Sequence, residues 1–150
     1  MYRHLLVPLE NSPYDEAILH HVRSLALLCD ARVTLIHVAD GFAARNMKSL
    51  KLRESEEMRL DREYLDRCVA GLAAAPLDVD AILASGDPAE EICAAAERER
   101  CDLIAMATHG HGFLNDVVRG SVANRVRHRC LIPVLLVRGA QDGGSAQAVT

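Results

Sequence analysis

Short apolar runs alternate along the chain with longer stretches of helical periodicity, and this alternation constrains the fold more than any other feature. Four apolar runs are predicted as strands, at 4–9, 32–38, 102–106 and 133–137, and residues 77–83, which alternate apolar and polar, are predicted as a further strand. Helices are predicted from 12, from 51 through an apolar stripe ending at 72, from 87 and over 121–130. Most strands are apolar on both faces, as in parallel sheets covered by helices. The chain is therefore expected to form a doubly wound α/β fold with a five-stranded parallel sheet.

Two of the predicted helices have clear start signals. Ser12 is placed to cap the first helix, with Asp15 three residues after the cap. Asp87 is placed to cap the third helix, with Glu90 closing a capping box. The region 40–50 has no clear periodicity and stays unassigned, with a lid over a site as one option.

The composition indicates one globular domain. The chain has 150 residues, half of them apolar, so a single core is expected. Lys and Arg number 17 against 21 Asp and Glu, a net charge of −4 that argues against general nucleic-acid binding. No apolar run approaches the about 18 residues of a membrane span, and the apolar start breaks at Pro8, too early for a signal peptide. A cytoplasmic location is expected, with no membrane or nucleic-acid partner.

The cysteines fit a reducing compartment. They are odd in number, widely spaced and without a C-x-x-C pair, which favours neither a disulfide framework nor a zinc ribbon. Most of them stand in apolar contexts, where cysteine behaves as a small hydrophobic residue. We expect reduced, mostly buried thiols at Cys29, Cys68, Cys93, Cys101 and Cys130.

The stretch from Thr108 to Ser121, THGHGFLNDVVRGS, carries the strongest functional signal. Gly110 and Gly120 allow a close approach of the backbone to a ligand. Gly120 and Ser121 also open a predicted helix, whose free N–H groups and dipole favour an anion. The stretch follows the fourth predicted strand, and ligands of doubly wound sheets bind beyond the carboxyl ends of strands. A phosphate cradle is therefore predicted here.

Two other phosphate-binding motifs do not fit this stretch. The chain has no Gly-Lys-Ser or Gly-Lys-Thr, so it lacks a Walker A loop. The sequence from Gly110 begins like G-x-G-x-x-G, but Asn115 stands in place of the third glycine. This stretch also follows the fourth strand and not the first, which disfavours a dinucleotide fingerprint.

These features together resemble the universal stress protein family over residues 2–138. The family's loop G-x2-G-x9-G-[ST] is matched by Ala107 to Gly110 and, nine residues later, by Gly120-Ser121; PVLLV at 133–137, VPLENS at 7–12 and GDPAE at 86–90 are similar to further family features. The resemblance implies an adenine-nucleotide α-hydrolase-like, Rossmann-like fold for a domain at 2–138. Residues 139–150 lack apolar periodicity and are expected to be a disordered tail.

The resemblance also implies a site for an adenine nucleotide, ATP with or without Mg²⁺. It assigns Pro8, Leu9, Glu10 and Val38 to the base and ribose; Ala107, His109 and Gly110 to the ribose and α-phosphate; and Gly120, Ser121, Val122 and Ala123 to the outer phosphates. Met106 and His111 are also assigned to the site, and His111 occupies a place where many relatives carry Arg or Lys. Two positions depart from the family pattern. Ala107 replaces the first loop glycine, and Glu10 replaces the aspartate after the first strand. The methyl group of Ala107 matters only if the backbone there needs a positive φ or touches the ligand.

Simpler interpretations of the same residues remain open. The loop glycines are common in any turn, Ser121 is also a good helix cap, and Glu10 is also a plausible solvated charge. A metal site built from His109, His111, His128 and Cys130 is poorly supported, because H-x-H in a glycine-rich loop lacks a paired carboxylate. No metal is expected.

A binding protein is favoured over an enzyme. The chain has no G-x-S-x-G and no Walker-type lysine, so at most slow ATP hydrolysis is expected. The first hypothesis is a stress-response regulatory module whose ATP occupancy alters its contacts. The alternative is a nucleotide-free dimeric interaction protein of the same fold, and an enzyme of the wider adenine-nucleotide group is a weaker third.

The last predicted strand suggests self-association. Pro133 to Val137 is apolar and is expected at a sheet edge, and such edges are normally paired or protected. The family resemblance implies antiparallel pairing of this strand across a two-fold axis, giving a homodimer. Lysine at both Leu135 and Leu136 is expected to split it.

Overall fold

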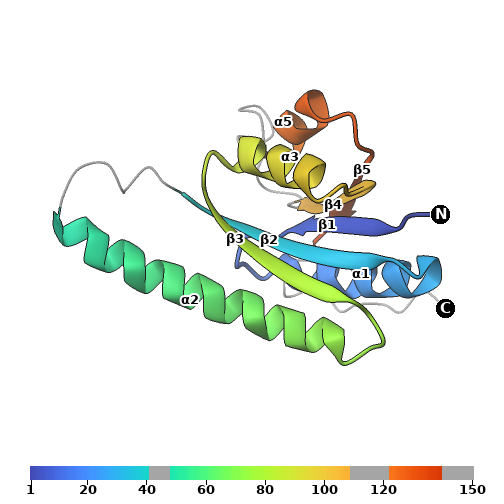
Figure 1. Ribbon diagram of the computed structural model, residues 1–150, viewed down its shortest axis with the longest axis horizontal. Helices are drawn as coiled ribbons and strands as arrows, with labels where there is room; N and C mark the ends of the chain where they lie inside the picture. The colour runs from blue at the N-terminus through green and yellow to red at the C-terminus, as the bar shows by residue number, and fades with distance from the viewer. Residues whose placement is uncertain (41–47, 109–121, 140–150) are drawn as a thin grey trace.

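Five strands form one sheet in the computed structural model, which describes residues 1–40, 48–108 and 122–139, the side chains of 40 and 48–55 excepted. The strands are β1 (His4–Pro8), β2 (Arg32–Asp40), β3 (Val79–Gly86), β4 (Leu103–Thr108) and β5 (Val134–Arg138). Neighbouring strands pair in parallel, in the order β3-β2-β1-β4-β5 (Figure 1). The predicted doubly wound sheet is confirmed, and its strand order reverses between β1 and β4.

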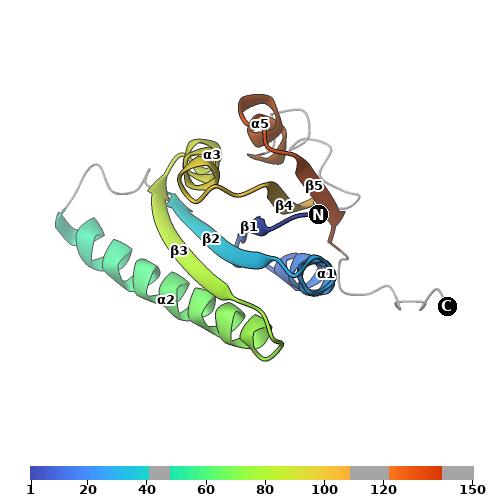
Figure 2. The ribbon, with the colours of Figure 1, turned by 45° about the vertical axis from the view of Figure 1, so that its right-hand side comes forward.

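Among the described residues, two helices cover each face of the sheet. Helices α1 (Asp15–Cys29) and α2 (Lys48–Ala73) lie on one face, and α3 (Pro88–Arg98) and α5 (Val122–Arg129) lie on the other (Figures 1 and 2). Helix α2 runs past the edge of the sheet at its N-terminal end (Figure 1). No helix in the described part of the chain is long and apolar enough to cross a membrane.

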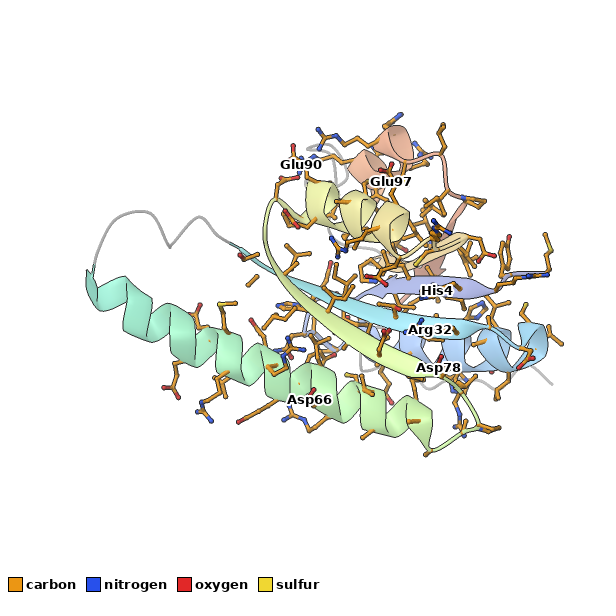
Figure 3. The ribbon with its side chains drawn as sticks, in the orientation of Figure 1. His4, Arg32, Asp66, Asp78, Glu90 and Glu97 are labelled. Carbon is orange, nitrogen blue, oxygen red and sulfur yellow. The ribbon has the colours of Figure 1, made fainter. Side chains whose placement is uncertain are left out.

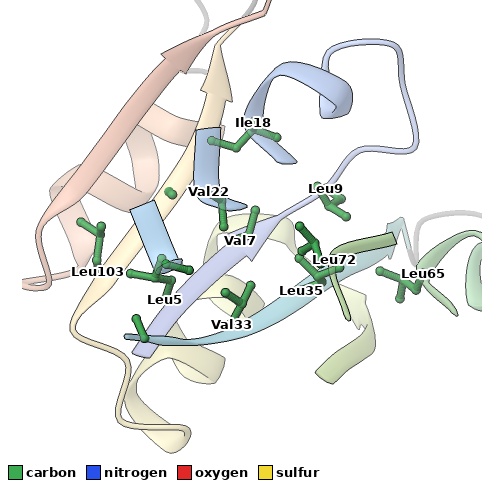
Figure 4. Close-up of a cluster of buried hydrophobic side chains, with 13 residues drawn as sticks. Leu5, Val7, Leu9, Ile18, Val22, Val33, Leu35, Leu65, Leu72 and Leu103 are labelled. Carbon is green, nitrogen blue, oxygen red and sulfur yellow. The ribbon is translucent and has the colours of Figure 1, made fainter. Parts of the chain in front are cut away.

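The alternation of side chains along β1 supplies both cores. Leu5 and Val7 point to the α1 and α2 side, where they pack with Ile18 and Val22 of α1 (Figure 4). Leu6 points to the opposite side, into the cluster beneath α3 and α5. Each of these side chains is fully buried, and burying one contributes roughly 1.5–3 kcal/mol.

The start of α1 differs from the prediction. Ser12 was predicted as its cap, but the helix begins at Asp15, with Tyr14 at the cap position and no side-chain cap bond. The reason is that the Asp15 carboxylate binds backward to the amides of residues 10–12 and winds that segment into a turn. The Oγ of Ser12 caps no helical amide and is buried without a partner among the described residues.

The start of α3 largely confirms the prediction. Asp87 caps the helix and accepts the N–H of Glu90 at 3.0 Å. The expected return bond of a capping box is replaced, because the Glu90 carboxylate pairs with Arg129 of α5 at 3.0 Å. Glu90 therefore joins α3 to α5, and Asp87 does the same through Arg125.

Several boundaries also shift. The third strand begins at Val79 and not at residue 77, and β4 continues through Thr108, which was predicted as loop. Gly139 is still part of the ordered domain, since it is buried and its N–H donates to the Thr108 carbonyl at 3.0 Å. The unassigned segment at 41–47, the loop at 109–121 and the predicted tail at 140–150 lie outside the described residues.

All five cysteines are free thiols, but only two of them are buried, so the expectation of mostly buried thiols is wrong. Cys101 and Cys130 are buried, and the other three are partly exposed. Burial raises the pKa of Cys101 to about 12 and that of Cys93 to about 11. These two thiols stay protonated at neutral pH, which is typical of structural cysteines.

Candidate functional site

The carboxyl ends of β1 and β4 meet where the strand order reverses. The structure brings predicted site residues from three strands to this edge of the sheet: Pro8, Leu9 and Glu10 at the end of β1, Val38 in β2, and Met106 and Ala107 in β4. In a doubly wound sheet, this reversal point is where ligands bind. Leu9 is buried and Glu10 is exposed, so the chain leaves the core between these two residues.

The N-terminus of α5 supplies the other described part of the predicted site. Val122 and Ala123 form its first turn and are half-buried, packed against the α3 side of the core. The free backbone N–H groups of a first helical turn favour an anion. The predicted residues His109, Gly110, His111, Gly120 and Ser121 lie outside the described residues.

The backbone at Ala107 answers one of the two questions that its methyl group raises, whether this position needs a positive φ. Residues with positive φ in the described chain are Asn11, Asp30 and Arg100, with Gly86 as the glycine example. Ala107 is not among them and lies in the regular β4 strand. Alanine therefore adopts this conformation without strain, and replacing glycine does not distort the strand end.

The turn between β1 and α1 is held by a residue whose role the sequence did not reveal. Asp15 is only 2% exposed. Its Oδ1 accepts the N–H of Glu10 at 3.1 Å, and its Oδ2 accepts the N–H groups of Asn11 at 2.8 Å and Ser12 at 3.2 Å. Asn11 has φ +59°, a left-handed conformation that asparagine tolerates better than most residues.

Helix α2 contacts the same turn through polar side chains. The hydroxyl of Tyr64 donates to Oδ2 of Asp15. Burial and this hydrogen bond raise the pKa of Tyr64, so the hydroxyl remains a donor at physiological pH. Nearby, His37 of β2 bonds through Nδ1 to the carbonyl of Leu9 at 2.8 Å, and its Nε2 lies 3.4 Å from the carboxylate of Asp61.

A second polar network lies at the amino ends of the strands. His4 of β1 bonds through Nε2 to Thr34 at 2.7 Å and through Nδ1 to the carbonyl of Glu99 at 3.1 Å. The Thr34 hydroxyl donates to Asp80, which also pairs with Arg32 at 2.8 Å; His4 and Arg32 are labelled in Figure 3. This network ties β1, β2 and β3 together at the end of the sheet opposite the predicted site.

A bidentate ion pair holds α5 against α3. The guanidinium of Arg125 donates from both terminal nitrogens to the two carboxylate oxygens of Asp87, at 3.0 and 2.8 Å. Arg125 lies one turn after Val122, the first residue of α5. The pair therefore fixes the position of the helix terminus that belongs to the predicted phosphate side of the site.

This ion pair predicts a pH dependence of stability. The Arg125 guanidinium, together with the N–H of Glu90, holds the pKa of Asp87 below its usual range. The stabilisation is present above the unfolded pKa of about 3.9 and is lost as pH falls through the lower folded value. In Asp87→Asn, thermal melting should show a shallower loss of Tm below about pH 4. Asp66→Asn, an exposed change on α2, serves as the control. If both variants lose Tm equally steeply below about pH 4, the prediction is contradicted.

Comparison with known proteins identifies the family. The sequence model described as "Universal stress protein family" matches residues 1–138. The chain belongs to this family. Universal stress protein MJ0577 of Methanocaldococcus jannaschii is 30% identical over 92% of this chain and 96% of its own length. The solved MJ0577 structure covers 95% of this chain and 99% of its own, with a TM-score of 0.83 and 28% identity.

More distant universal stress proteins share the fold. One, solved in complex with cAMP, is 17% identical and covers 93% of this chain and 98% of its own, with a TM-score of 0.73. Another, from Archaeoglobus fulgidus in complex with dAMP, is 18% identical and covers 90% of this chain and 97% of its own, with a TM-score of 0.65. The expected adenine-nucleotide α-hydrolase-like, Rossmann-like architecture is thereby confirmed.

Proposed function

We propose that this universal stress protein binds an adenine nucleotide, ATP in the first instance, beyond the carboxyl ends of β1 and β4. The observation that carries the proposal is the ordinary backbone at Ala107, because the main argument for a lost site was the methyl group at this position. Glu10, the second departure, is exposed at the strand end, on a turn whose three amides are held by Asp15.

Two further observations support the proposal. The turn after β1 and the N-terminus of α5 belong to the strand ends on either side of the reversal point, where this class of fold binds ligands. Family members of the same fold are solved with cAMP and dAMP, both of which are adenine nucleotides. Adenine is thus the base that the site would take.

The proposed role is binding without catalysis. Backbone amides at a helix terminus and the predicted Ser121 hydroxyl hold phosphate oxygens but supply no general base or acid. Nucleotide occupancy would then act by changing what the protein contacts. The alternative, a nucleotide-free interaction protein of the same fold, rests on the two departures from the loop pattern.

His111 leads to a pH-dependent expectation for this site. It stands in the predicted phosphate-binding loop, and imidazole is cationic only near or below its reference pKa of about 6.5. Affinity for ATP is therefore expected to fall as pH rises from about 6 to about 8, and His111→Arg should remove this dependence. Calorimetric titrations across that range measure both proteins, and a flat profile in the wild type would contradict the role of His111.

We also propose a homodimer through β5. This strand is a sheet edge, paired on one side with β4, and Leu136 is 45% exposed on it. Leu135 instead packs against the core, so the double lysine change suggested by the sequence would also damage the fold. A lysine substitution at Leu136 alone is therefore the sharper test of the dimer.

Leu136→Lys is expected to convert the dimer to monomers, because it places a cation against its own copy across the two-fold axis. Light scattering at several concentrations measures the mass. The matched control is Leu131→Lys, the same change at a fully exposed residue before β5. A monomeric wild type, or a Leu136→Lys protein that remains dimeric, would refute this interface.

The proposed function is tested by the ligand that the protein carries from the cell. Protein purified without added nucleotide is denatured in acid, and the released small molecules are identified by mass spectrometry. An adenine nucleotide in near-stoichiometric amount supports the proposal. Release of no nucleotide, together with an unchanged melting temperature in millimolar Mg-ATP, supports the nucleotide-free alternative.

A further inference from the structure

Two side chains of α2 reach the turn that follows β1. Asp61 and Tyr64 are three residues apart on the helix, so they lie on one face. Tyr64 donates its hydroxyl to Asp15, and Asp61 lies 3.4 Å from Nε2 of His37. Each helix residue therefore contacts the turn indirectly, Tyr64 through Asp15 and Asp61 through His37.

Each intermediate side chain binds the backbone of the turn directly. Asp15 accepts the three successive amides of residues 10–12. His37 bonds to the carbonyl of Leu9, and the N–H of Leu9 donates to the carbonyl of Ile36 at 2.8 Å. Four consecutive residues, 9–12, are thus held from the α2 side.

These contacts are shielded from water. The side chains of His37 and Asp61 are 12% and 17% exposed, and Asp15 is 2% exposed. Polar contacts of low exposure are less screened than surface pairs, and breaking one leaves a group without its partner. The partners of α2 are therefore expected to affect the conformation of the turn measurably.

We propose that Asp61 and Tyr64 are positioning residues for the nucleotide site. Through them, α2 holds residues 9–12 at two points and so sets the geometry of the site. The inference rests on the proposed function, because Leu9 and Glu10 belong to the predicted base and ribose contacts. Neither α2 residue needs to touch the nucleotide. By reciprocity, nucleotide binding stabilises α2 in return, so occupancy of the site is transmitted to the long charged helix that runs past the sheet (Figure 1).

The first measurement is made without nucleotide. Amide hydrogen exchange of residues 10–12 is followed by NMR in Tyr64→Phe and Asp61→Ala. Tyr64→Phe removes only the hydroxyl, and its control is Tyr2→Phe, at the opposite end of β1. Asp61→Ala is matched by Asp66→Ala, an exposed change on the same helix. Exchange at 10–12 is expected to accelerate roughly tenfold in the two test variants and to stay unchanged in the controls.

The second measurement is the dissociation constant of ATP in the same four proteins. Each test variant is expected to bind about fivefold to tenfold more weakly than its control. Asp61→Asn should restore most of the loss, because its side-chain amide can donate to or accept from Nε2 of His37. A general loss of packing would not be restored by this substitution.

The outcomes separate the two proposals. If the wild type binds ATP and the test variants bind it as tightly as their controls, the positioning role is overturned and the proposed function stands. Unchanged exchange at residues 10–12 in both test variants also overturns it. If the wild type binds no adenine nucleotide, the proposed function fails, while accelerated exchange still shows that α2 holds the turn.

Discussion

Replacing Asp15 with asparagine is expected to lower the free energy of unfolding by about 3 kcal/mol. The carboxylate accepts from Glu10 on one oxygen and from two further amides and the Tyr64 hydroxyl on the other. Asparagine keeps one oxygen and places an NH₂ group at the other position, where it meets an amide that can only donate. The site is 2% exposed, so water cannot replace the lost acceptor.

Urea unfolding measures this loss, and for a domain of this size it corresponds to a Tm about 6–12 °C lower. The control is Glu16→Gln, which removes a charge from the same first turn of α1 at an exposed position. The control separates the hydrogen bonds of Asp15 from the interaction of any acidic residue with the helix dipole. Equal stability of the two variants would show that Asp15 does not hold the turn.

Replacing Ala123 with aspartate is expected to weaken ATP binding by roughly a hundredfold. The substitution adds a negative charge to the first turn of α5, where the outer phosphates are expected. Two like charges about 5 Å apart repel by about 3 kcal/mol at an effective dielectric constant near 20. Aspartate in a first helical turn favours the helix itself, so the loss of binding should occur without a comparable loss of stability.

The matched control is Ala123→Asn, which has the same shape without the charge. It separates electrostatic repulsion from any effect of the added volume at this half-buried position. Calorimetric titration of both variants with Mg-ATP gives the comparison. If the aspartate and asparagine variants bind ATP equally, the phosphates do not lie at the N-terminus of α5.

The repeating and local features of the fold could be predicted from the sequence. Apolar runs placed four of the five strands, since a buried parallel strand must be apolar on both faces, and the alternation of apolar and polar residues placed the partly buried β3. Asp87 was identifiable as a cap because its acceptor role involves Glu90, only three residues away. These features depend on neighbours within a few residues, which is the range over which periodicity and capping patterns carry information.

The polar contacts around the turn after β1 could not be predicted in this way. Asp15 resembles any acidic residue in a first helical turn, and its partner Tyr64 is 49 positions away. The contact between His37 and Asp61 likewise joins a strand to a helix that follows an unassigned segment. The start of α1 was misplaced at Ser12 for a local reason, because the Asp15 carboxylate binds backward to the amides of residues 10–12, which the capping pattern does not reveal.

The candidate site was only partly predictable as well. Its strand-end residues followed from the topology, because the carboxyl ends of parallel strands share one edge of the sheet. Whether Ala107 is compatible with that site depends on its backbone dihedral angles, which the residue type does not specify. The roles of residues outside the described ranges, such as His111, remain predictions from the sequence.

Thermal melting of the wild-type protein in increasing Mg-ATP tests the central claim most directly. A ligand that binds only the folded state stabilises it by about 2.7 kcal/mol at a hundred times its Kd, so Tm should rise by roughly 5–10 °C and follow a single-site curve. GTP at the same concentrations should produce a smaller shift. An unchanged Tm in millimolar Mg-ATP, measured on protein shown to carry no bound nucleotide, would contradict adenine-nucleotide binding by this chain.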